Sequence, residues 1–124
     1  MRTAIEVIDK LNCYSFHDMP LDSIGITTET GTRLNINAKT FDEKTEGYIH
    51  LKISFIDIQK LISNSLYLTK NSDMEIYSFE YEFKDVFKCR ITLLTGSAEP
   101  GLTIELDCLT IEINNCKEYI STDE

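Results

Sequence analysis

The residues best suited to chemistry lie near the N-terminus, where Cys13, Ser15, His17, Asp18 and Asp22 follow one another closely. A histidine beside carboxylates can act as a general base, and a thiol can act as a nucleophile. His17 with Asp18 or Asp22 is therefore the candidate catalytic group. A structural role is the alternative, in which the His17 ring and the Asp18 carboxylate bond backbone groups left open where a helix meets a strand.

The motifs that would complete a catalytic site are missing from the sequence. There is no Gly-x-Ser-x-Gly, no Walker A motif and no His-Glu-x-x-His. A nucleophile and its base also need donors for an oxyanion and a third orienting group. We therefore favour the structural role for His17 and a non-enzymatic function. The other histidine, His50, alternates with Leu51 and is expected to face solvent.

The cysteines do not form a metal-binding pattern, because no Cys-x-x-Cys is present. Only Cys13 and His17 could share one helix face, and two ligands do not make a zinc site. The first residues lack the basic and then apolar regions of a signal peptide. We expect no metal, no cofactor and a cytoplasmic protein whose thiols are reduced and mostly buried.

The net charge limits the kind of partner. The chain has 124 residues, 21 acidic and 12 basic, and a formal net charge of -9 that is concentrated in residues 63–124. Phosphate backbones and anionic lipid surfaces repel such a chain, so we expect neither nucleic-acid binding nor membrane binding. A basic protein would be attracted, and its approach accelerated.

These residues must be positioned by a short helix and a set of strands. Residues 3–12 carry apolar side chains at helical spacing, and Thr3 with Glu6 forms a capping-box pattern. The period then changes to two. If Ile26 faces Leu34 and Ile24 faces Ile36, the turn places Gly31 where a left-handed residue is needed, which predicts a hairpin.

The third strand, at residues 49–55, alternates clearly, and the pattern then weakens. Ile58, Leu61 and Ile62 suit a helical turn, and residues 66–69 could form another strand. The second half alternates again over residues 77–83, 87–93 and 102–108. A β-bulge near Cys108 is expected, because the apolar phase changes there to Leu109, Ile111 and Ile113.

Pairing these last three strands by their apolar faces predicts charge rows on the opposite face. One row is Glu82, Lys88 and Asp107, and the other is Glu80, Arg90 and Glu105. Opposite charges that face each other across a sheet stabilise it, and a slip of one residue would bury them. The rows leave four acidic residues without a partner, which makes them candidate binding residues: Glu75, Asp85, Glu99 and Glu112.

Together these patterns predict one domain over residues 1–124 of mainly β (α+β) class. We expect an antiparallel meander of six or seven strands, as a sandwich or open barrel, with one N-terminal helix.

The helix followed by Ser15, Phe16, His17 and Asp18, and then by alternating strands, resembles small bacterial proteins with that signature. It is similar to the immunity protein 50 family of polymorphic toxin systems. The resemblance implies a binder that neutralises a toxin, implies no catalysis and gives no contact residues.

Three functions follow as hypotheses. The first is a non-enzymatic acidic binding protein that blocks a basic partner such as a toxin. The second is a small ligand-binding or hydrolytic β-domain that uses His17 with Asp18 or Asp22. The third is a structural or oligomer-forming domain that pairs through an uncovered strand edge.

Overall fold

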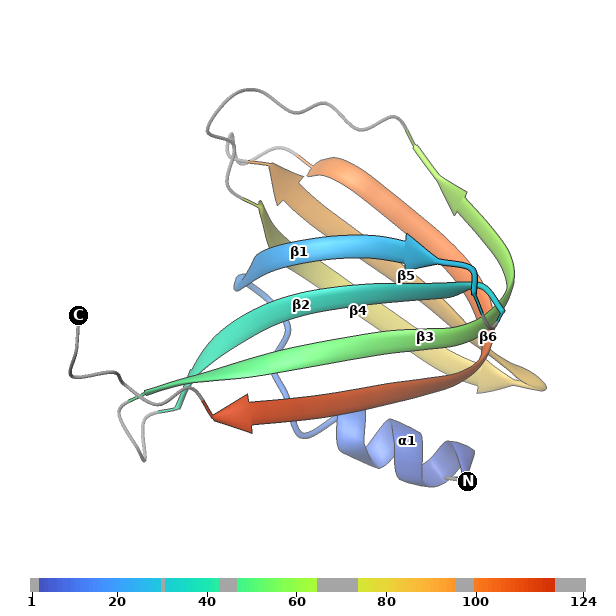
Figure 1. The fold of residues 1–124 in the computed structure, drawn as a ribbon, viewed down its shortest axis with the longest axis horizontal. Coiled ribbons are helices and arrows are strands. Elements are labelled where there is room, and N and C mark those ends of the chain that lie inside the picture. Colours follow the sequence, from blue (N-terminus) through green and yellow to red (C-terminus); the bar gives the residue numbers. More distant parts are fainter. Residues whose placement is uncertain (1–2, 30, 43–46, 65–73, 96–99, 118–124) are drawn as a thin grey trace.

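The chain forms one antiparallel sheet that closes into a barrel, with a single helix (Figure 1). The computed structural model describes residues 3–29, 31–42, 47–64, 74–95 and 100–117. Neighbouring strands follow the order β1-β2-β3-β6-β5-β4. This confirms the mainly β class, the six antiparallel strands and the N-terminal helix. A sandwich or an open barrel was expected, whereas the sheet closes because β1 pairs with β4. The six strands also do not form a single meander, because β3 pairs with β6 rather than with β4. The elements are α1 (Ala4–Leu11), β1 (Met19–Thr27), β2 (Arg33–Asp42), β3 (Gly47–Ser63), β4 (Met74–Lys84), β5 (Val86–Thr95) and β6 (Pro100–Lys117).

The barrel closes at a narrow seam between β1 and β4. Met19 pairs with Ile76 and Pro20 with Glu75, and the Asp18 amide donates to the Ile76 carbonyl at 2.7 Å. Among the described residues, β1 and β4 pair nowhere else. No described helix has the length and apolar character needed to cross a membrane.

The two longest strands, β3 and β6, pair along most of their length and bend together (Figure 1). Their register shifts between Ile58 and Lys60, opposite Cys108 and Asp107, just after Asp57 takes a left-handed φ of 56°. The predicted irregularity near Cys108 is therefore present, and the extra residue belongs to β3. The phase change is confirmed for Ile111 and Ile113, which are buried.

Leu109 is the exception to the predicted phase, because half of its side chain is exposed. The inward face of β6 ends at Cys108 and resumes only at Ile111, so Leu109 falls outside the core. The helical turn expected over Ile58 to Ile62 is also wrong. This segment continues β3, because β6 is long enough to offer it backbone partners up to Ile104. Residues 66–69 lie outside the described residues.

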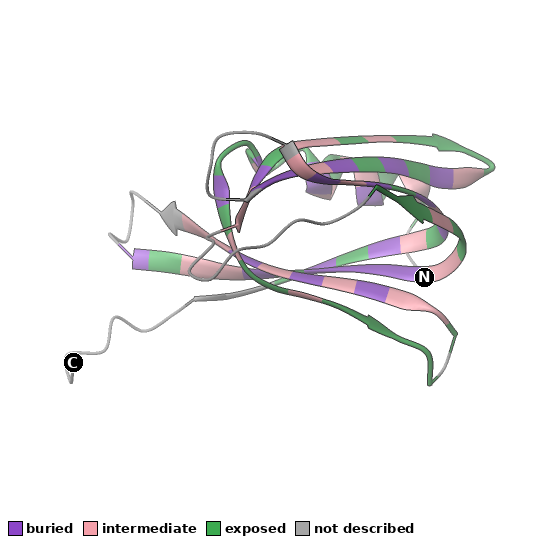
Figure 2. Ribbon diagram, turned by 90° about the horizontal axis from the view of Figure 1, so that it is seen from above, coloured by how far each residue is buried: buried purple, intermediate pink, exposed green. Residues whose placement is uncertain are grey.

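The hairpin of β1 and β2 has the predicted register, with Ile24 opposite Ile36 and Ile26 opposite Leu34. Gly31 takes the expected left-handed conformation, with a φ of 98°. Burial alternates along the strands, as Figure 2 shows for the inward and outward residues. Ile26 departs from this pattern, because 58% of it is exposed although it lies on the apolar side of the hairpin.

The helix α1 packs against β6 and contributes Val7 and Leu11 to the core. The predicted capping box is present, because the Thr3 hydroxyl accepts from the Glu6 amide while the Glu6 carboxylate accepts from the Thr3 amide. After the helix, the buried Phe16 ring packs edge-on against Phe79 of β4, with ring centroids 5.0 Å apart. These contacts fix the segment that carries His17 and Asp18.

Candidate functional site

The structure brings His17 and Asp18 together on the surface. Their Nδ1 and Oδ2 atoms are 3.0 Å apart, and more than half of each side chain is exposed. The His17 ring lies against Tyr77 of β4, with centroids 5.3 Å apart. Asp18 turns the chain into β1 with a left-handed φ of 65°. Neither His17 nor Asp18 lines the two hollows described below.

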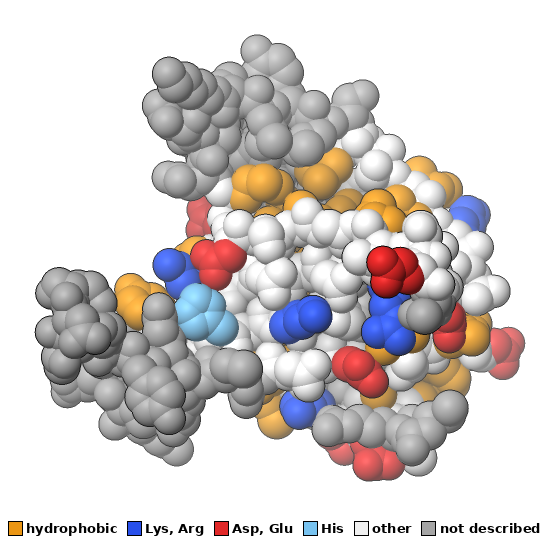
Figure 3. Space-filling view, viewed as in Figure 1, with side chains coloured by type: hydrophobic (Ala, Val, Ile, Leu, Met, Phe, Trp, Pro, Cys, Tyr) orange, Lys and Arg blue, Asp and Glu red, His pale blue; other side chains and the backbone are white. Residues whose placement is uncertain are grey.

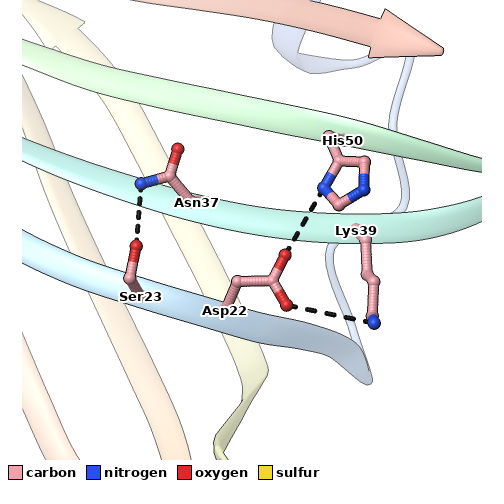
Figure 4. Close-up of polar contacts among 5 residues, drawn as sticks. All are labelled: Asp22, Ser23, Asn37, Lys39 and His50. Carbon is pink, nitrogen blue, oxygen red and sulfur yellow. Dashed lines mark hydrogen bonds and ion pairs between the residues drawn. The ribbon is translucent and has the colours of Figure 1, made fainter. Parts of the chain in front are cut away.

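Asp22 is placed in a different cluster, shown in Figure 4. A bulge between Leu21 and Ser23 turns Asp22 toward β2 and β3. Its carboxylate lies 4.0 Å from the Lys39 ammonium and 3.5 Å from the His50 ring. The predicted combination of His17 with Asp18 is therefore assembled, whereas Asp22 faces His50. The alternation of β2 and β3 could have indicated this, because Lys39 and His50 are cross-strand partners.

The cysteines of the described core are not placed for reaction. Cys89 and Cys108 are buried on the inner faces of β5 and β6. A hydrogen bond with Cys108, followed by burial, raises the pKa of the Cys89 thiol. Because only the thiolate is a good nucleophile, Cys89 stays an unreactive thiol near neutral pH. Cys13 is exposed, and its thiol donates to the Asp9 carbonyl within the helix at 3.3 Å.

The charge rows have the predicted register. Arg90 pairs directly with Glu80 on β4 and with Glu105 on β6. Lys88 in the same way stands between Glu82 and Asp107. All of these side chains are exposed or half-exposed, which confirms that they mark the outer face of this sheet.

The rows continue onto β3, where the sequence did not predict them. Lys60 pairs with Asp107, and Ile62 pairs with Glu105. Ile62 is 56% exposed, so an apolar side chain stands at the end of a charged row. The two residues were missed because residues 58–62 were expected to form a helical turn.

A hollow of about 570 Å³ lies along these rows. Lys88 and Asp107 form an ion pair at 3.5 Å. Glu80, Glu82 and Glu105 form no ion pair within the part of the chain that the structure describes. We name this surface the charged face. Its lining includes Lys60, Ile62, Glu80, Glu82, Lys88, Arg90, Glu105 and Asp107. Such a surface can bind a charged protein, because three of its carboxylates, Glu80, Glu82 and Glu105, are oriented by the sheet and remain open.

The four candidate acidic residues do not gather on one surface. Glu75 lies at the seam, and Asp85 forms the turn at the opposite end of β4. Glu112 lies on β6 beside Ser54 of β3. Glu99 lies outside the described residues. Glu75, Asp85 and Glu112 have no ion-pair partner among the described residues.

The outer face of β1, β2 and β3 has a different character, which Figure 3 shows from the front. Uncharged polar side chains pair across the strands. Asn37 donates to Ser23 and Ser54 donates to Asn35, both at 2.8 Å. Lys39 and Lys52 add positive charge to this face. The carboxylates of the charged face lie instead on β4 and β6, in the other half of the strand order.

No family model, curated protein or solved structure matches the chain.

Proposed function

We propose that this protein is a non-enzymatic binding protein whose partner is a basic protein, and that the charged face is the surface that meets it. The observation that carries the proposal is the set of open carboxylates, Glu80, Glu82 and Glu105, which the sheet holds at fixed spacing on β4 and β6, the two strands that flank β5. The net charge of -9 supports it, because such a charge accelerates the approach of a basic partner.

The exposed Ile62 gives the surface a feature that charge alone would lack. Interfaces gain most of their affinity from a few side chains that become fully buried, while charges around them set orientation and rate. Ile62 stands beside Glu105 at the end of one row, where a partner could cover it. The partner is therefore expected to present lysine or arginine side chains around an apolar contact.

A basic toxin is the partner that we propose for this surface. The resemblance of the Ser15–Asp18 segment to immunity proteins supports this choice, and so does the acidity of the chain. Hydrolysis by His17 with Asp18, and oligomer formation through a strand edge, stay predictions. Hydrolysis would require His17, and oligomer formation would require an open strand edge. The binding experiment below depends on neither of these features.

The test compares two variants with the same loss of charge. In the first, Glu80→Gln and Glu82→Gln remove two open carboxylates from the charged face. In the second, Asp9→Asn and Glu29→Gln remove two exposed carboxylates elsewhere. We expect the first variant to bind poly-L-lysine about tenfold more weakly than the second, since each exposed charge contributes roughly 0.2–1 kcal/mol. Titration at low and high salt, followed by calorimetry, measures the difference.

Equal losses in the two variants would contradict the proposal, because only total charge would then matter. A third variant with Glu75→Gln, Asp85→Asn and Glu112→Gln tests the candidate residues separately. Affinity capture from the native host, repeated with the Glu80 and Glu82 variant, then asks whether one basic polypeptide is retained by the wild-type chain and lost by the variant.

A further inference from the structure

A second hollow lies on the inner side of the sheet, beside the part of β1 that follows its short pairing with β4. Its volume is about 470 Å³. The lining comes from the second half of β1, the start of β2, the end of β3 with Asn64, and the start of β6. The lining residues are Ile24, Gly25, Ile26, Leu34, Leu61, Ser63, Asn64, Leu102 and Ile104.

The geometry of the sheet explains why a hollow forms there. The described pairs between β1 and β4 end at Pro20, while β1 continues to Thr27. Inward side chains of β3 and β6, such as Leu61 and Ile104, then face β1 across a space rather than across a strand. Figure 3 shows hydrophobic side chains gathered at this side, above β1 in that view.

The chemistry of the lining is apolar and uncharged. Six of the described lining residues are isoleucine or leucine, and none is acidic or basic. Ile26 is 58% exposed and Ile24 is half-buried, although both face this hollow. Covering such side chains with an apolar molecule is favourable, because apolar surface is removed from water. The volume also falls within the range of about 300–1,000 Å³ that small-molecule sites occupy.

Two polar residues lie at one part of the lining. The Asn64 side-chain oxygen accepts a hydrogen bond from the Thr103 backbone amide at 2.7 Å. The Asn64 backbone amide donates to the Thr103 carbonyl at 3.2 Å. These bonds fix the orientation of Asn64, and its NH₂ group remains a donor. Ser63 next to it is exposed and offers a hydroxyl. A neutral oxygen on a ligand could accept from these groups.

We propose that this cavity is a binding site for an uncharged aliphatic molecule with one neutral polar head, such as a medium-chain alcohol. An anionic head is disfavoured because no cation is present in the described lining. The site uses inward residues of β3 and β6, whereas the charged face uses their outward neighbours. The proposal therefore stands independently of the protein partner.

The test titrates three probes with the same tail into the full-length protein: 1-decanol, decanoate and decyltrimethylammonium. We expect 1-decanol to bind with one molecule per chain, and each charged probe to bind at least tenfold more weakly. Ile26→Lys should weaken 1-decanol tenfold or more and bring decanoate closer to it. Leu109→Lys, at an apolar side chain that is 50% exposed outside the lining, should keep wild-type affinity.

Equal weakening in the two lysine variants, or binding of several decanol molecules per chain, would overturn the proposal. So would a dimer that Ile26→Lys converts to a monomer, because a second copy would then cover the cavity. If Ile26→Lys fails to fold, Ile26→Trp fills the same space with an apolar ring and should also abolish binding of 1-decanol. Wild-type affinity in a folded Ile26→Trp variant would contradict the site.

Discussion

The described residues with a left-handed backbone lie at two hairpin turns, at the entry to β1 and beside the register shift in β3. Among the described residues, the non-glycine residues with positive φ are Asp18, Asp57 and Asp85. The glycine with positive φ is Gly31. Aspartate tolerates this conformation because its short side chain can bond nearby backbone groups. Gly31 was predictable from the hairpin register. The three aspartates were not, because aspartate is equally common in turns and at helix caps.

Gly31 is the residue at which we expect substitution to be most clearly unfavourable. A Cβ atom there would lie 2.6 Å from the Asp57 carboxylate oxygen, and the φ of 98° strains any side chain. Gly31→Ala should lower the free energy of unfolding by about 1–3 kcal/mol. Chemical denaturation measures this change.

Gly25 provides the matched control on the same hairpin. An added Cβ would meet nothing within 4 Å. Gly25→Ala should leave stability unchanged or raise it by up to about 1 kcal/mol, because alanine restricts the unfolded chain. Equal destabilisation by both substitutions would show that the contact with Asp57 is unimportant.

At the level of elements, the strict alternation of apolar and polar residues made the strands predictable. Where this alternation is interrupted, the second part of β3 was not recognised as a strand. The charge rows on β4, β5 and β6 follow from apolar pairing, since a strand has only two faces. The second part of β3 was missed because Asp57 and the register shift break the period there. For this reason Lys60 and Ile62 were not predicted to belong to the charged face.

The N-terminal cap of helix α1 can be tested separately from the rest of the fold. Thr3→Ala removes the side-chain acceptor for the Glu6 amide and should cost about 1 kcal/mol of stability. The loss extends to the whole fold because Val7 and Leu11 belong to the core. Thermal unfolding followed by circular dichroism measures it.

Thr3→Ser is the control for the cap, because serine keeps the hydroxyl acceptor. Its unfolding midpoint should remain close to that of the wild-type chain. If Thr3→Ser is as destabilised as Thr3→Ala, the methyl group rather than the hydrogen bond stabilises the helix.

For the whole molecule, the meander expected from the sequence is present within β1, β2 and β3 and within β4, β5 and β6, whereas closure of the barrel depends on few residues. Met19, Pro20, Glu75 and Ile76 pair without any periodic pattern that would indicate it. The placement of Asp22 beside His50, away from His17, likewise depends on a bulge. The local sequence pattern carries little information about such long-range pairings. The candidate site could therefore be predicted only in part.

The seam should open before the rest of the barrel. The Asp18 amide bonds the Ile76 carbonyl beside only two strand pairs, whereas β3 and β6 pair along most of their length. In native-state hydrogen exchange, the Asp18 amide should exchange through a local opening that costs less than global unfolding. Amides in the centre of the β3–β6 pairing should exchange only on global unfolding. Equal protection of both would contradict a weak seam.

The strand order also divides the chain into two halves of sequence neighbours. β1, β2 and β3 form one half, and β4, β5 and β6 form the other. Hairpins within each half close short loops, whereas joining β3 to β6 must bring together segments distant in the chain. Because of this chain entropy, we expect the two halves to dock last and the docking step to set the folding rate.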